Sequence, residues 1–214
     1  EGDAGAMHER DWEGDREPPR TGGAVQLATE GTGPLWQRDY SGVIVDTPYA
    51  PEEVMRLLLR EFPRFSPEEG AAFHRLGDPS QPLVMDEEMT IDLRGYGECA
   101  VRVVRVDERS LTLRTLEGHL EAGRITFGAY RDERSRLVFR ITGRYRISGP
   151  LRYVGYRLFG MPIQEAIWGE FIKRVAAAVG GRLEGEVEVN TRKVPELAGD
   201  RGELETATFP TRDE

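Results

Sequence analysis

Apolar and polar residues alternate along the middle of the chain. The longest alternating run spans residues 136–147, where only Val138 breaks the pattern. Its inward set is Leu137, Phe139, Ile141, Gly143, Tyr145 and Ile147. Because successive side chains of a strand point to opposite faces, this period of two predicts a strand with one buried and one exposed face.

Shorter runs with the same period precede it, over residues 89–93, 97–106, 110–115 and 125–129. In the second run the alternation slips at Val103 and Val104, as a β-bulge would cause. Turn-forming stretches separate the runs: Arg-Gly-Tyr-Gly from residue 94, Asp-Glu-Arg-Ser from 107 and Arg-Asp-Glu-Arg-Ser from 131. Together they predict an antiparallel meander of about five strands.

Helical periods flank the meander. After a strand predicted at 35–47, Pro51 begins a helix whose apolar residues recur every three or four positions up to Pro63. A second short helix is predicted at 67–76 from the same Pro-Glu-Glu opening. A long amphipathic helix is predicted within 150–181, interrupted early at Gly160 and Pro162.

The net charge of −9 is carried by the ends of the chain, and the middle is close to neutral. We expect residues 1–34 to be an acidic, loosely docked or disordered segment, 35–182 to be the folded domain, and 183–214 to be an acidic tail in which EVEV adds a short strand. No apolar run is long enough to span a membrane, and no signal peptide is visible, so a cytoplasmic location is expected.

These elements predict an α+β fold. The long helix and the meander must each bury an apolar face, and a curved antiparallel sheet of about six or seven strands wrapped around the C-terminal helix does both. Two short helices would follow the first strand. The space between sheet and helix is the natural place for an apolar cavity.

The order of elements resembles the START-like (SRPBCC, helix-grip) superfamily over residues 36–181. The first strand followed by a proline-led helix, APEEVMRLL, is similar to the usual opening of that superfamily. Residues 86–180 resemble a bacterial and plant family within it that has no settled activity. Its motif reads Thr-Leu-x-Gly-His-Pro-Glu-x-Gly. Here the matching residues are Thr115, Leu116, Gly118, His119, Glu121 and Gly123, and Leu120 replaces the proline. The resemblance implies a ligand-binding cavity and little more. We expect no cofactor.

His119 is the residue of this motif with the most varied chemistry. It could hydrogen-bond the backbone of its own turn, contact a ligand in the cavity, or act with a carboxylate such as Glu121 in acid–base catalysis. A metal site is not expected, because the other histidines, His8 and His74, lie in a terminal segment and on another element.

Inward positions of the meander and the long helix supply the candidate ligand contacts. These are Thr115, His119, Phe127, Phe139, Tyr145, Tyr156, Ile167, Trp168 and Phe171, and Tyr40 could add a hydroxyl. The opposite face carries Arg140, Arg144 and Arg146, for which we expect solvent exposure and surface ion pairs. No exposed aromatic ladder accompanies this row, so a nucleic-acid partner is not expected.

Three functions fit these features. The first is binding of a small or medium hydrophobic molecule (a lipid, isoprenoid or aromatic compound) by a monomer or homodimer without stable membrane insertion. The second is a cyclase- or hydrolase-type enzyme on the same scaffold that uses His119 with a carboxylate. The third is a protein-interaction module whose core is filled by its own side chains.

Overall fold

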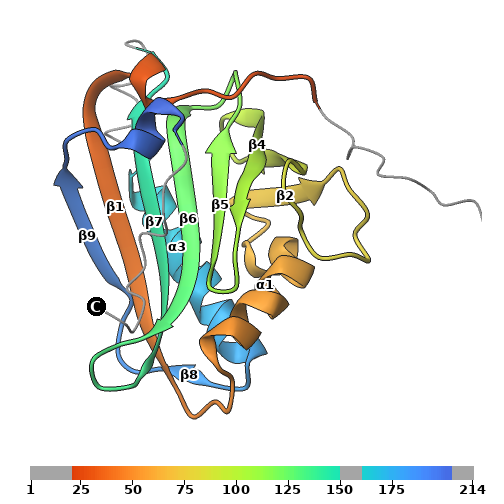
Figure 1. Ribbon diagram of the computed structural model, residues 1–214, viewed down its shortest axis with the longest axis vertical. Coiled ribbons are helices and arrows are strands. Elements are labelled where there is room, and N and C mark those ends of the chain that lie inside the picture. The colour runs from red at the N-terminus through yellow and green to blue at the C-terminus, as the bar shows by residue number, and fades with distance from the viewer. Residues whose placement is uncertain (1–20, 150–160, 204–214) are drawn as a thin grey trace, which may run out of the picture.

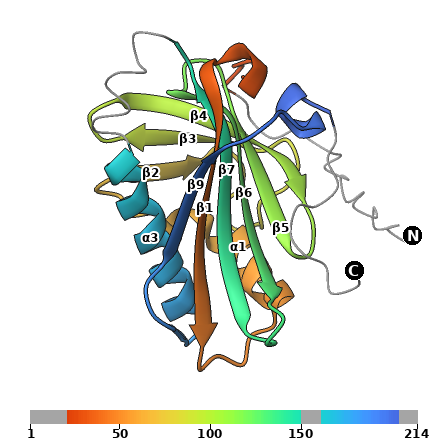
Figure 2. The same cartoon turned by 90° about the vertical axis from the view of Figure 1, so that its left-hand side faces the viewer.

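The computed structural model describes residues 21–149 and 161–203, and its dominant feature is one curved, antiparallel, nine-stranded sheet (Figure 1). The strand order is β2-β3-β4-β5-β6-β7-β1-β8, and β9 also pairs with β1. Helices α1 and α3 lie on the same side of the sheet, and α3 runs along its inner face (Figures 1 and 2). The predicted α+β helix-grip architecture is therefore confirmed.

The strands are β1 (Thr32–Val45), β2 (Ala71–Arg75), β3 (Glu88–Leu93), β4 (Gly97–Val106), β5 (Ser110–Thr115), β6 (Glu121–Arg131), β7 (Leu137–Ile147), β8 (Arg182–Leu183) and β9 (Glu188–Lys193). The helices are α1 (Pro51–Phe65) and α3 (Met161–Ala178), with short 3-10 turns at Ala28–Glu30 (η1) and Ala198–Arg201 (η3). The predicted interruption at Gly160 lies outside the described residues.

The meander follows its sequence pattern closely. The inward set of β7 is buried, and β7 pairs along its length with β6 and β1. The register of β4 and β5 shifts between Val103 and Arg105, so the bulge predicted from the slip in alternation is confirmed.

The second short helix predicted at 67–76 is wrong. Only a turn forms after Pro67, whose carbonyl accepts the N–H groups of Gly70 and Ala71. The chain then becomes β2 and pairs with β3. Ala71 and Phe73 are buried while His74 is exposed, which is the alternation of an edge strand.

Helix α1 continues past Pro63, where the sequence predicted its end. The helix is distorted at Glu61, whose φ of −122° and ψ of 22° are not helical. Proline has no N–H to bond the carbonyl four residues earlier, so the carbonyl of Leu59 is released. That carbonyl accepts the N–H of Leu83 at 2.7 Å instead, which ties the loop before β3 to the helix.

An aromatic cluster fills the space between α1, α3 and the sheet. Phe62 and Phe127 meet edge to face at 5.0 Å, and Phe127 lies 5.3 Å from Phe171. Gly42 on β1 allows α3 to approach closely, because a Cβ there would lie 2.8 Å from Ile172. This half of the interior is closely packed.

The C-terminal segment packs on the sheet. β9 pairs with β1 and extends the sheet, and η3 lies over the outer face of the sheet (Figure 1). The sheet therefore includes residues that follow position 183, where the acidic tail was expected to begin. The arginine row is not simply a solvated face. Arg144 is buried, because Asp200 of η3 covers it and also pairs with Arg124. Within the described residues, no helix is long and apolar enough to cross a membrane.

Candidate functional site

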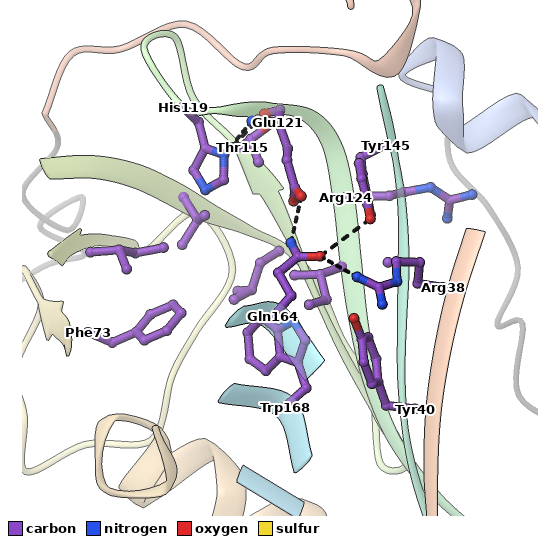
Figure 3. Close-up of a pocket in the computed structure, with 15 residues that line it drawn as sticks. Arg38, Tyr40, Phe73, Thr115, His119, Glu121, Arg124, Tyr145, Gln164 and Trp168 are labelled. Atoms are coloured by element: carbon purple, nitrogen blue, oxygen red, sulfur yellow. Dashed lines mark hydrogen bonds between the residues drawn. The ribbon is translucent and has the colours of Figure 1, made fainter. Parts of the chain in front are cut away.

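Two adjoining cavities lie between the first half of α3, strands β1–β7 and the loop that precedes β6. Figure 3 shows the residues that line the inner one. The inner cavity has a volume of about 60 Å³ and the outer one about 140 Å³. Both are lined by Phe73, Ile91, His119, Glu121, Gln164 and Trp168. The shared walls make the pair a single candidate site.

Most of the lining is apolar. Val101 and Leu113 add to the inner cavity, whereas Ala71, Leu93 and Ile167 add to the outer one. The outer cavity is also lined by Ile163, which is exposed and therefore marks its mouth. A ligand entering here would exchange water for aromatic and aliphatic contacts.

The loop at 116–120 is held by its own motif residues. The Thr115 hydroxyl accepts the Gly123 N–H at 3.0 Å. Gly118 has a φ of +92°, and its carbonyl accepts the Tyr96 hydroxyl at 2.8 Å. At Gly123 any Cβ would lie 2.2 Å from the carbonyl oxygen of Arg144, so only glycine fits. Thr115, Gly118 and Gly123 are therefore structural residues of the loop.

His119 faces both its own backbone and the cavity. Nδ1 lies 3.0 Å from the backbone N–H of Glu121 and 3.1 Å from its carbonyl oxygen, and the other ring nitrogen, Nε2, points into the cavity (Figure 3). Burial lowers the pKa of the imidazole to about 4, against a smaller opposing effect of its hydrogen bond to the Glu121 backbone. The ring is therefore neutral near pH 7.

A chain of polar side chains closes the opposite side of the inner cavity. Glu121 turns inward and accepts the Gln164 Nε2 amide at 2.5 Å. The Gln164 Oε1 atom accepts Arg38 Nη1 at 3.1 Å and the Tyr145 hydroxyl at 3.4 Å. Gln164, on the first turn of α3, thus joins β6, β7 and β1 at one point (Figure 3).

Arg38 is almost completely buried, with 1% of its surface exposed. Besides Gln164, its guanidinium donates to the Thr191 hydroxyl at 3.1 Å and to Glu165 at 2.5 Å, so it connects β1, β9 and α3. Sequence reasoning missed this residue. The available signal was its even-numbered position in β1, which it shares with the inward residues Tyr40 and Ile44.

Tyr40 presents a buried hydroxyl that has no hydrogen-bond partner among the residues in the described ranges. Its ring lies under the Arg38 guanidinium, 5.3 Å from the ring centroid. Burial raises the pKa of the phenol well above its usual value, although the Arg38 charge opposes this. The hydroxyl therefore stays protonated and can donate.

The structure divides the sequence-predicted contacts into two groups. Thr115, His119, Tyr145 and Trp168 line the inner cavity, and His119, Ile167 and Trp168 line the outer one. Phe127, Phe139 and Phe171 lie in the closely packed core instead, and are fully buried. Tyr156 lies outside the described residues. Sequence reasoning did not find Arg38, Phe73, Ile91 and Gln164.

The His119–Glu121 pair is not arranged as a catalytic dyad. Nδ1 binds the backbone amide of Glu121 rather than its carboxylate, so no carboxylate increases the basicity of the ring. His74 lies apart and pairs with Asp92 at 3.1 Å. Within residues 21–149 and 161–203, no group of three or more His, Cys, Asp or Glu side chains could hold a metal ion.

No family model and no curated protein matches the chain. Among solved structures, norcoclaurine synthase from Thalictrum flavum, in complex with dopamine and hydroxybenzaldehyde, is similar at 12% identity and a TM-score of 0.48, covering 77% of this chain and 96% of that chain. A Thermobifida fusca protein is similar at 14% identity and a TM-score of 0.46, covering 67% and 93%. Major latex-like protein 151 from Panax ginseng is similar at 18% identity and a TM-score of 0.37, covering 63% and 97%. These likenesses carry no conclusion about the ligand or activity of this chain.

Proposed function

We propose that this protein binds a small, mainly apolar molecule that carries a polar group, in the paired cavities between the sheet and α3. The observation that carries the proposal is the convergence of His119, Glu121 and Gln164 on one region of otherwise apolar cavities. Ligand sites are typically apolar with a few placed polar groups, which matches this arrangement. The element order also supports membership of the START-like superfamily.

The cavity volumes favour a compact ligand. An engineered protein cavity of about 150 Å³ holds benzene, and the outer cavity, at about 140 Å³, is of that size. A one-ring or two-ring aromatic compound therefore suits the site better than a long-chain lipid.

The two alternative functions are less well supported. Nδ1 of His119 contacts the backbone N–H and carbonyl of Glu121 and not its carboxylate, so the pair lacks the carboxylate–imidazole contact of an acid–base dyad. A catalytic role for His119 with Glu121 has no geometric basis here. A module with a filled core would leave no space beside Trp168 and Ile91.

The test is binding of ethylbenzene, followed by ligand-observed NMR and by thermal unfolding. At ten times the dissociation constant, a ligand specific for the folded state raises the melting temperature of a domain of this size by about 3–6 °C. Ile163→Trp should block the mouth and abolish both signals. Val189→Trp, a change at another exposed apolar residue on β9, should leave them unchanged.

If ethylbenzene does not bind to the unmodified protein, the proposal is overturned. So would binding that persists at full strength in Ile163→Trp, since the ligand would then lie elsewhere.

A further inference from the structure

We propose that the ligand presents a neutral hydrogen-bond acceptor, a carbonyl oxygen above all, to the Nε2–H group of His119. This deepens the proposed function and rests on it. It specifies the class of ligand that the cavities select: a ketone, aldehyde, quinone or amide on an apolar ring, in preference to an acid, an amine or a plain hydrocarbon.

Nδ1 of His119 lies beside both backbone groups of Glu121, 3.0 Å from the N–H and 3.1 Å from the carbonyl oxygen. The N–H contact requires Nδ1 to accept, and a neutral imidazole then carries its proton on Nε2; the proposal rests on this tautomer. The backbone of His119 is also held in place, because its carbonyl accepts the Ser148 hydroxyl at 2.6 Å and its N–H donates to the Leu116 carbonyl at 3.1 Å. The donor therefore points in a constant direction.

This donor has no partner of its own. Nε2 makes no hydrogen bond with any residue in the described part of the chain, and His119 as a whole is only 8% exposed. An N–H that faces an apolar cavity has few acceptors within reach, and a ligand oxygen at this point would supply one. The Tyr40 hydroxyl of the inner cavity is a second buried donor without a partner in these ranges.

The charges around the cavities favour a neutral acceptor over a carboxylate. Each guanidinium nitrogen of Arg38 already has an oxygen partner: Thr191, Gln164 and Glu165. Glu121 lines both cavities, so a second carboxylate would bring like charges together in a poorly solvated space. A protonated amine has no lone pair to accept the Nε2–H.

The experiment compares probes that share one ring and differ in one group: ethylbenzene, acetophenone, benzoate and 1-phenylethylamine. Dissociation constants are measured by ligand-observed NMR titration at pH 7. A neutral hydrogen bond gives acetophenone about three- to tenfold tighter binding than ethylbenzene. Benzoate and 1-phenylethylamine should bind more weakly than either.

Two substitutions at one position separate the two nitrogens of His119. His119→Asn keeps an acceptor near Nδ1 for the Glu121 amide but removes the donor at Nε2, so acetophenone should lose its advantage over ethylbenzene. His119→Gln can place an amide N–H near Nε2 and should keep that advantage. A long-range ¹H–¹⁵N spectrum should also show His119 as the Nε2–H tautomer, identified by its loss in His119→Asn.

The outcomes distinguish the preference for a carbonyl acceptor from the proposed function itself. Binding of ethylbenzene and acetophenone with equal affinity to the unmodified protein would overturn this inference and leave the proposed function standing. So would an Nδ1–H tautomer, or tighter binding of benzoate or the amine. Failure of all four probes to bind would overturn both.

Discussion

Asp200 offers the sharpest test of how the C-terminal segment is held on the sheet. Its carboxylate is fully buried and lies between the guanidinium groups of Arg124 and Arg144. Arg144 donates to it at 2.7 and 3.1 Å and Arg124 at 3.2 Å, while the Leu197 N–H donates at 2.9 Å. Asp200→Ala would remove the carboxylate that these two arginines share.

The expected cost is large because both cations remain buried. Arg124 and Arg144 expose only 7% and 6% of their side chains. Removing one partner from a buried ion pair typically costs about 3–5 kcal/mol, since the remaining cation loses its counter-charge and is poorly solvated. Arg144 keeps hydrogen bonds to Gln37 and Pro195, which compensate for only part of the lost charge interaction. Against a total stability of about 5–15 kcal/mol for a typical domain, Asp200→Ala should remove a large fraction.

Urea unfolding at pH 7 measures the effect as a fall in the midpoint at unchanged slope. Glu203→Ala is the matched control, because Glu203 pairs with Arg201 on the surface and should contribute less than about 1 kcal/mol. Replacing Arg124, Arg144 and Asp200 together with Met, Met and Leu should restore most of the loss, since no buried charge remains. A cost below 1 kcal/mol for Asp200→Ala would refute the reasoning.

The pH dependence gives an independent check on the same carboxylate. Burial would raise the pKa of Asp200, but hydrogen bonds from Arg144 and the Leu197 amide, with the charges of both arginines, outweigh it and hold the pKa below its usual range. The unfolded state then binds the proton more readily. The stabilisation is present above the unfolded pKa of about 3.9 and is lost as the pH falls through the folded value. Asp200→Ala should lack this loss.

Three further predictions concern the candidate site. Tyr40→Phe removes a hydroxyl that has no partner in the described ranges, so the free energy of unfolding should rise or stay unchanged. Tyr145→Phe removes a hydrogen-bonded hydroxyl and should lower the free energy of unfolding by about 1 kcal/mol. Urea unfolding measures both. Burial lowers the pKa of His119 to about 4, so between pH 6.5 and 4 the unfolded state takes up a proton more readily than the folded state. The free energy of unfolding should therefore fall by about 3 kcal/mol over this range, and His119→Asn should reduce this pH dependence. Gly123→Ala should lower the melting temperature several times more than a Gly→Ala change at a surface position, because the new Cβ would overlap the Arg144 carbonyl.

The meander was predictable because its burial pattern is local. One face of each strand is buried, so a period of two appears directly in the sequence, as from Leu137 to Ile147. The bulge near Val103 was also predictable, because the alternation of apolar and polar residues shifts by one position there. The start of α1 at Pro51 was equally local, since proline suits the first turn of a helix.

The failures arose where distant segments decide the outcome. Residues 67–76 carry a helix-like opening, but Ala71–Arg75 pairs with β3 and becomes an edge strand. Arg144 resembled a surface arginine until Asp200, 56 residues later, covered it. Arg38 and Gln164 meet 126 residues apart, and nothing in either local sequence indicates the other. Such contacts depend on topology rather than on local pattern.

The stretch from Thr115 to Gly123 shows how local constraint and topology combine at the site. Thr115 and Gly123 bond each other across the loop, which leaves the side chains of His119 and Glu121 to face the cavities. Their spacing of two residues places both on one side of the chain as it enters β6. The same spacing brings the Glu121 backbone to His119 Nδ1, and this contact leaves the opposite ring nitrogen facing the cavity. Of the three roles that the sequence leaves open for His119, the geometry thus combines two: a hydrogen bond to the backbone of its own loop and a ring nitrogen that faces an apolar space.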